Sequence, residues 1–318
     1  MTLDVSAYVH GIHPRSETLV AATRDLERDR TTPEKVEEQF RREREDVLDL
    51  QREAGLDFLS DGLLRWADIF RPLVEASRGL DARVLVRWFD NNSFYRAPEV
   101  GERPRLDGGL ASWVTEDGFP EPRVATLPSP FLFSRVAQTD GDRDALMLEL
   151  AGGVLRPAVE HLVQAGAGVV HLQEPWLAFH GIGDASWEPF GEALARVREG
   201  ADGVPVVLHT YFGDAAPHAD RLVGLPVDAV GIDFAETDLE ALAGPWGTGM
   251  LVGCLDGRRS ILEDPEQTAS FVGRVAERVR PTRLFVSSGS DLELLPAEVG
   301  REKIRLLGQV AQILRRQG

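Results

Sequence analysis

Short apolar runs alternate with amphipathic segments along most of the chain. Eight runs rich in Val, Ile and Leu have strand character, and most of the gaps between them carry apolar residues at helical spacing. Strands that alternate with helices predict a parallel sheet, because each helix returns the chain to the start of the next strand. Eight such units in 318 residues predict an α/β protein, a single-domain (β/α)8 TIM barrel spanning residues 1–318. The runs lie near residues 5–10, 57–61, 123–127, 168–173, 204–209, 228–233, 249–255 and 283–288.

Capping residues mark several of the predicted helices. Thr32 followed by Pro33 predicts a helix start, and Gly55 predicts its end. An apolar stripe predicts one long helix through residues 146–163, and a last helix is predicted over about 297–316.

The main irregularity is the stretch of about residues 80–122. It contains an apolar run at 83–89 and then a segment rich in Pro and Gly. We interpret it as an inserted β-hairpin arm between barrel strands 2 and 3.

Polar side chains follow several of the predicted strands. Because the active site of a (β/α)8 barrel lies at the C-terminal ends of its strands, these residues mark the expected site. Side chains two residues apart share a face of a strand, so three groups are expected to project together. The groups are His171 with Gln173, His209 with Tyr211, and Cys254 with Asp256 and Arg258.

Composition narrows the partners that the chain can have. A formal net charge of -17 and a pI of about 4.9 disfavour nucleic acid and anionic membrane surfaces as partners. The single cysteine excludes an internal disulfide framework and a cysteine-rich zinc site. No apolar stretch long enough to span a bilayer and no signal-peptide pattern are found, so we expect a cytoplasmic protein.

Five motifs occur in an order and spacing that resemble a known family. The chain resembles the C-terminal catalytic barrel of cobalamin-independent methionine synthase and its short archaeal relatives, which are uroporphyrinogen-decarboxylase-like barrels. The resemblance covers nearly the whole chain. The motifs are His10-Gly-Ile-His-Pro-Arg-Ser16, Gln51-Arg-Glu-Ala-Gly-Leu-Asp57 with Asp61-Gly62 and Arg65 after it, Leu127-Pro-Ser-Pro130, His171-Leu-Gln-Glu-Pro175 and His209-Thr-Tyr211.

The same resemblance implies that the zinc and homocysteine ligands of the family are largely lost. The family binds zinc through His, Cys, Glu and Cys, and the matching positions here hold His209, Tyr211, Asp233 and Ser290. One imidazole, one carboxylate and two hydroxyl groups would hold zinc poorly. Two acidic motifs of the family become Asp61-Gly62-Leu63 and Gln173-Glu174-Pro175, which removes carboxylates that would bind a substrate ammonium group.

We therefore predict a metal-free polar site in which His209 carries out acid–base chemistry. The predicted catalytic residues are His209, Tyr211, Asp233 and Glu174. The predicted substrate-binding residues are Arg15, Asp61, Arg65, His171, Gln173, Asp256, Arg258 and Ser290. The alternative is a replacement metal site formed by His171, His209, Asp233 and Cys254.

Three functions follow from this interpretation. The first is a methyl or one-carbon transferase that acts on a substrate other than homocysteine. Its methyl donor would be free methyl-tetrahydrofolate or a corrinoid protein, and zinc is not expected as a cofactor. The second is a metal-free lyase or decarboxylase that binds an acidic substrate through Arg15, Arg65 and Arg258. The third is a non-catalytic binding homologue.

Overall fold

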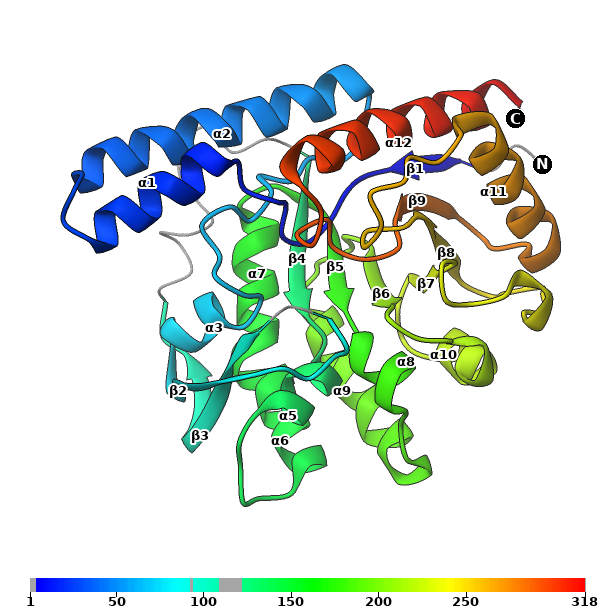
Figure 1. The fold of residues 1–318 in the computed structure, drawn as a ribbon. Coiled ribbons are helices and arrows are strands. Elements are labelled where there is room, and N and C mark those ends of the chain that lie inside the picture. The colour runs from blue at the N-terminus through cyan, green and yellow to red at the C-terminus, as the bar shows by residue number, and fades with distance from the viewer. Residues whose placement is uncertain (1–3, 92–93, 109–121, 318) are drawn as a thin grey trace.

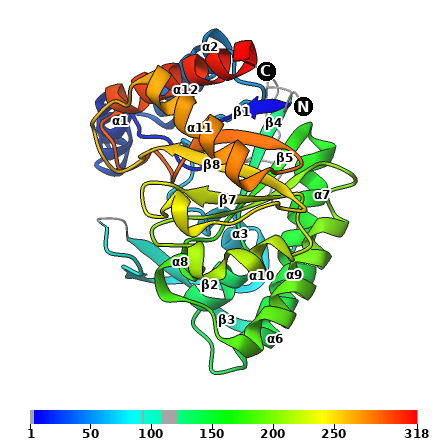
Figure 2. The same ribbon diagram turned by 90° about the vertical axis from the view of Figure 1, so that its right-hand side faces the viewer.

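A curled parallel sheet forms the centre of the molecule. The computed structural model describes residues 4–91, 94–108 and 122–317. Seven strands run in the order β1-β9-β8-β7-β6-β5-β4, and every neighbouring pair is parallel (Figures 1 and 2). This arrangement confirms the predicted α/β barrel class. The strands are β1 (Val5–Ala7), β4 (Arg123–Pro128), β5 (Ala167–Gln173), β6 (Val206–Thr210), β7 (Ala229–Asp233), β8 (Gly249–Leu255) and β9 (Leu284–Ser288).

The apolar run at 57–61 takes the second strand position without forming a regular strand. Leu59 forms an isolated parallel bridge with Arg123. The backbone N–H of Asp57 donates to the Ala7 carbonyl (2.8 Å), and its carboxylate accepts from the Ala7 N–H (2.6 Å). Because a side chain replaces one ladder bond here, the segment links β1 to β4 but is not a continuous strand.

Helices cover the outside of the sheet (Figure 2). The predicted first long helix begins after Thr32 and ends at Gly55, which adopts a left-handed conformation (φ 72°). The predicted helix through residues 146–163 consists of two α-helices joined by one π-helical turn, Ala151–Leu155. The helices are α1 (Glu17–Glu27), α2 (Pro33–Ala54), α3 (Arg71–Glu75), α5 (Pro130–Val136), α6 (Arg143–Leu150), α7 (Arg156–Gln164), α8 (Pro175–His180), α9 (Trp187–Glu199), α10 (Ala219–Val223), α11 (Pro265–Val279) and α12 (Ala297–Gln317).

The predicted hairpin arm is present as two antiparallel strands, β2 (Ser77–Val86) and β3 (Tyr95–Leu106). It lies toward the end of the barrel at which the arrows of β4 and β5 point (Figure 1). Part of the expected insertion, residues 109–121, falls outside the described residues. The arm therefore brings side chains to the same end of the sheet as the predicted active site.

Successive side chains of each strand point to opposite faces of the sheet and so contribute to two separate cores. Every second residue faces the barrel interior, and the other residues pack against the helices. The interior cluster is Tyr8, Val124, Val169, Val207, Ala229, Leu251 and Phe285.

Among the described helices, none is long and apolar enough to cross a membrane.

Candidate active site at the carboxyl end of the barrel

Three histidines meet inside the barrel, in the layer of side chains that follows the interior cluster toward the carboxyl ends of the strands. His171 follows Val169 by two residues in β5, and His209 follows Val207 by two residues in β6. His10 lies just after β1 and, like the other two, is completely buried. One ligand atom from each ring lies within 4.8 Å of those of the other two rings. The His10 and His171 rings stack with centroids 3.9 Å apart.

The hydrogen bonds of these imidazoles are incomplete. The Tyr8 hydroxyl lies 3.0 Å from His171 Nδ1, whereas Nε2 of His171 and both ring nitrogens of His209 lack a hydrogen-bond partner among the described atoms. Nε2 of His10 lies 3.3 Å from the Ser288 carbonyl. Burial and the nearby His10 lower the pKa of both His171 and His209 well below the usual value. These two rings are therefore neutral at pH 7.

A glycine in β7 makes room for His209. A Cβ atom at Gly231 would lie 2.7 Å from His209 Cδ2, closer than packed carbon atoms approach. The imidazole therefore lies directly against the backbone of the neighbouring strand. Only glycine at position 231 permits this arrangement without displacing the ring.

A small pocket lies above the histidines at the mouth of the barrel. Gln173, Tyr211, Asp291 and Glu293 supply its polar groups, and its free volume is about 20 Å³. This volume holds about one water molecule, so a substrate can enter only if the lining moves. The apolar side of the pocket is formed by Ile12, Ile69, Phe70, Phe89, Tyr95, Leu132 and Pro175.

Asp291 connects this mouth pocket to the histidines. Its carboxylate accepts hydrogen bonds from the Ile12 N–H (3.1 Å) and from Nε2 of Gln173, and it lies 3.5 Å from His10 Nδ1. Tyr211 contacts the cluster directly, because its ring centre is 5.4 Å from that of His209. Burial, reinforced by the charge of Asp291, raises the pKa of the Tyr211 phenol well above its usual value. Tyr211 is therefore a neutral hydrogen-bonding group at pH 7.

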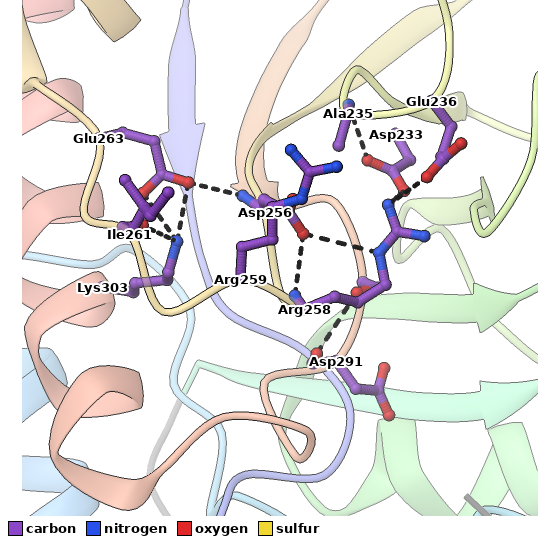
Figure 3. Close-up of polar contacts among 11 residues, drawn as sticks. Asp233, Ala235, Glu236, Asp256, Arg258, Arg259, Ile261, Glu263, Asp291 and Lys303 are labelled. Carbon is purple, nitrogen blue, oxygen red and sulfur yellow. Dashed lines mark hydrogen bonds and ion pairs between the residues drawn. The ribbon is translucent and has the colours of Figure 1, made fainter. Parts of the chain in front are cut away.

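Asp233 belongs to a neighbouring cluster of charged residues (Figure 3). Its Oδ1 accepts from the Ala235 N–H (3.0 Å), and its Oδ2 lies 3.9 Å from Nη2 of Arg258. The same guanidinium pairs with Glu236 and lies 3.6 Å from the Asp256 carboxylate. The described polar partners of Asp233 are thus on the β7–β8 side of the mouth, and none of them is His209. Burial raises the pKa of Asp233 to about 7, against the opposing effect of Arg258.

This pKa shift predicts how stability depends on pH. Since the folded-state pKa of Asp233 lies above its unfolded value, the unfolded protein binds fewer protons between these values, and stability falls as pH rises. We expect the free energy of unfolding of the original protein to fall by about 2 kcal/mol between pH 5 and pH 7 because of Asp233, and we expect Asp233→Asn to lack this fall. Urea unfolding of both proteins at several pH values measures this difference. Parallel pH profiles for the two proteins would contradict the shift.

Glu174 caps a helix at the end of β5. One carboxylate oxygen accepts from the Leu177 N–H at the start of α8 (2.9 Å). The other accepts from the Leu132 N–H (3.0 Å) and from the Ser129 hydroxyl. Burial nevertheless raises its pKa to about 7. These hydrogen bonds hold the end of β5 and the start of α8 against the segment at Ser129, and the catalytic role of Glu174 stays a prediction.

Arg15 and Arg65 have partners of their own, although the charge of Arg15 also acts on Glu293 at the mouth pocket. Arg15 donates to the Trp66 carbonyl (2.7 Å), and Arg65 pairs with Glu37 of α2. Asp61 accepts from the Leu63 N–H (3.0 Å). None of these three side chains lines the mouth pocket, and no described residue that lines it is basic. Within the described part of the chain, the charged lining of the mouth pocket is acidic, which does not suit the acidic substrate of the predicted lyase.

Cys254 does not join the histidines, so the structure does not bring together the alternative metal set of His171, His209, Asp233 and Cys254. Since Leu251 faces the interior, alternation directs Cys254 outward, where it packs with the core between sheet and helices. Its thiol donates to the Ser287 carbonyl (3.5 Å). Cys254 and Asp256 line a different pocket, about 500 Å³ in volume, with Phe271 of α11. Cys254 therefore does not face the barrel interior with the other predicted polar groups.

The four residues that the resemblance assigns to the zinc positions of the family are together a poor set of zinc ligands. Two of the four, Tyr211 and Ser290, offer only hydroxyl groups, and the Ser290 hydroxyl donates to the Asp291 carbonyl (3.4 Å). Asp233 faces the charged cluster of Figure 3. Only His209 of this set has nitrogens without a partner among the described atoms. This donor set therefore supports no chemistry through a zinc ion.

Sequence reasoning missed three residues of the site. His10 lies two residues after the inward-facing Tyr8, at the end of the first apolar run, so alternation could have placed it inside. Asp291 and Glu293 follow the last apolar run and line the mouth pocket. Asp291 is 118 residues away from Gln173 in the sequence, so no local pattern indicates their contact, which depends on closure of the sheet.

Comparison with known proteins gives one family match. The model of "Cobalamin-independent synthase, N-terminal domain" matches residues 71–280, whereas the motifs above were compared with the C-terminal barrel of the same family. A 5-methyltetrahydropteroyltriglutamate–homocysteine methyltransferase of Herpetosiphon aurantiacus is 27% identical over 241 residues, covering 73% of this chain and 31% of that protein. The chain spans about a third of the length of such relatives. A methionine synthase of Sulfurisphaera tokodaii is 24% identical and matches 96% of this chain and 91% of its own length.

Two solved structures share the fold. A putative vitamin-B12-independent methionine synthase from Listeria monocytogenes superposes with a TM-score of 0.76 at 15% identity, over 98% of each chain. A B12-independent methionine synthase from Shewanella, solved with selenomethionine, superposes with a TM-score of 0.73 at 19% identity, over 91% of each chain. At these identities the similarity supports the fold alone.

Proposed function

Because the chain belongs to the cobalamin-independent methionine synthase family, we propose that it is a methyl or one-carbon transferase whose acceptor is a molecule other than homocysteine. The mouth pocket carries this proposal. It lies at the carboxyl ends of the strands, where (β/α)8 barrels place their reacting groups, and it adjoins the buried histidines through Tyr211.

The chemistry of the pocket favours an acceptor with a cationic or amine group. Asp291 and Glu293 place two carboxylates beside Gln173 and Tyr211. Aromatic rings form much of the remaining wall, and such rings attract cations at their faces. An ammonium group next to Asp291 would thus gain charge pairing and an aromatic contact. In this proposal Tyr211 orients the acceptor nitrogen, and Asp291 takes up the proton that the ammonium group must release before the nitrogen can accept the methyl group.

The donor set argues against homocysteine. The family activates that thiol through zinc, and the residues at the corresponding positions here include two hydroxyl groups in place of thiolates. A thiol acceptor would also meet no cationic side chain among the described residues that line the mouth pocket. An amine acceptor carries the positive charge that suits the acidic groups of this lining. The methyl donor that we propose is methyl-tetrahydrofolate or a methylated corrinoid protein.

An isotope-transfer experiment tests the function. Purified protein is incubated with methyl-labelled tetrahydrofolate, or with methylcobalamin as a corrinoid probe, and with a panel of amines, thiols and homocysteine. We expect label in an amine product, detected by mass spectrometry, and faster labelling of that product than of methionine. Faster formation of methionine than of any methylated amine would contradict the proposed acceptor class. Absence of label in every product would contradict methyl transfer.

A further inference from the structure

We propose that His10, His171 and His209 form a tri-histidine site for a divalent transition-metal ion, with Zn²⁺ as the favoured ion. This set differs from the positions that bind zinc in the resembled family, and it shares only His209 with them. It also differs from the set predicted from sequence, since His10 takes the place of Asp233 and Cys254. The inference concerns metal binding itself and does not depend on the identity of the methyl acceptor.

The distances among the rings suit a metal ion. The three ligand atoms lie within 4.8 Å of one another. Zinc–nitrogen bonds of about 2.0–2.1 Å in a tetrahedral site separate the nitrogens by about 3.4 Å. A contraction of up to about 1.4 Å between the ligand atoms would therefore close the site. The rings come from β5, β6 and the segment after β1, so the barrel scaffold fixes their backbones.

Unsatisfied buried nitrogens are the second observation. Nε2 of His171 and both nitrogens of His209 have no hydrogen-bond partner among the described atoms, although both side chains are completely buried. A buried polar atom without a partner costs about 1–3 kcal/mol. A metal ion bound by these nitrogens would remove much of that cost.

Neighbouring polar groups support the assignment. The Tyr8 hydroxyl at Nδ1 of His171 leaves Nε2 of the same ring available, which is the usual arrangement behind a metal-binding histidine. Nε2 of His10 lies 3.3 Å from the Ser288 carbonyl, which suits an N–H donor behind a metal-binding ring, and Nδ1 lies 3.4 Å from Gln173 Nε2 and 3.5 Å from the Asp291 carboxylate, so an ion bound at Nδ1 would take the place of the Gln173 contact. These contacts fix the orientation of two of the three rings. His209 is held by packing against Gly231.

A three-nitrogen set leaves a coordination position open, as in catalytic zinc sites. A bound ion would supply Lewis-acid chemistry to a ligand that reaches this position. Tyr211 contacts His209 and also lines the mouth pocket, so the cluster and the pocket are adjacent. The histidines would then act as ligands, in place of the acid–base role that the sequence predicts for His209.

Metal titration of the purified full chain tests the site. After treatment with a chelator, the protein is titrated with Zn²⁺ in competition with a chromophoric chelator, and separately with Co²⁺ while the visible absorption is recorded. We expect one equivalent of each ion to bind, with a Co²⁺ spectrum typical of a low-coordinate nitrogen site. Binding of less than 0.1 equivalent at a hundredfold excess of Zn²⁺ over protein would overturn the proposal.

Substitutions assign the ligands. We expect His10→Gln, His171→Gln and His209→Gln each to weaken Zn²⁺ binding at least 100-fold, and His218→Gln, a histidine outside the cluster, to leave it unchanged. Circular dichroism checks that each variant is folded. Tyr8→Phe is a milder variant that keeps all three ligands, and we expect it to weaken binding about 10-fold at unchanged stoichiometry. If His209→Gln is folded and its Zn²⁺ affinity is unchanged, the assignment is contradicted. If His209→Gln does not fold, an unchanged Zn²⁺ affinity of Tyr8→Phe contradicts the assignment instead.

Discussion

Asp291→Asn is expected to lower kcat/KM for methyl transfer by about 100- to 1000-fold, equivalent to about 3–4 kcal/mol of transition-state stabilisation. The carboxylate accepts hydrogen bonds from the Ile12 N–H and from Gln173 at the mouth pocket. The amide keeps the shape but removes the charge that would face a cationic acceptor. It also replaces one carboxylate oxygen, a hydrogen-bond acceptor, with an NH2 group, a donor that would face an existing N–H group. Steady-state rates with the labelled donor measure the effect.

The matched control for this prediction is Asp184→Asn. Asp184 is a surface carboxylate paired with Arg221, and its side chain is 90% exposed. This variant removes the same charge far from the mouth pocket, so its rate should stay within about twofold of the original, as surface substitutions usually have small effects. Equal rates for Asp291→Asn and Asp184→Asn, with both proteins folded, would remove Asp291 from the site.

Gly308→Ala is expected to lower the free energy of unfolding by about 3 kcal/mol or more. Gly308 lies in α12, where the helix packs against the end of α2. A Cβ atom there would lie 2.1 Å from the Ala54 carbonyl oxygen and 2.8 Å from the Ala54 Cβ. Because the obstructing oxygen belongs to the backbone, the two helices must separate to accept the methyl group. Urea unfolding followed by circular dichroism measures the change.

A second helical glycine provides the control. Gly273 lies within α11, and a Cβ atom at this position would meet nothing within 4 Å. Alanine has the higher helix propensity, so Gly273→Ala should be neutral or should stabilise the protein by up to about 1 kcal/mol. If Gly308→Ala shows the same small gain, the helices are not in close contact at this point.

Local patterns predicted the elements well because each depends on neighbouring residues. The helix from Pro33 to Ala54 follows from its capping residues and apolar stripe, and seven of the eight predicted strand runs are strands in the sheet. The run at 57–61 is the exception. Its sequence has strand character, yet the Asp57 carboxylate replaces a backbone bond to Ala7, and this replacement depends on a contact across 50 residues.

The site was predicted less completely because it is formed by residues from distant parts of the chain. Alternation along single strands placed His171 with Gln173 and His209 with Tyr211, and these pairs do lie at the same end of the barrel. The same rule could not indicate which strands face one another across the interior. Asp233 and Arg258 were expected beside His209, and the structure instead joins them to Glu236 and Asp256.

The sequence by itself determined the barrel class, the hairpin arm and the end of the sheet at which polar groups gather, because periodicity and capping act over a few residues. Tertiary structure alone decided that His10 completes a cluster with His171 and His209. It also decided that Cys254 faces the helices and that Asp291 reaches Gln173. Closure of the sheet brings the segment after β1 beside β5 and β9, and no local pattern encodes the distance between those residues.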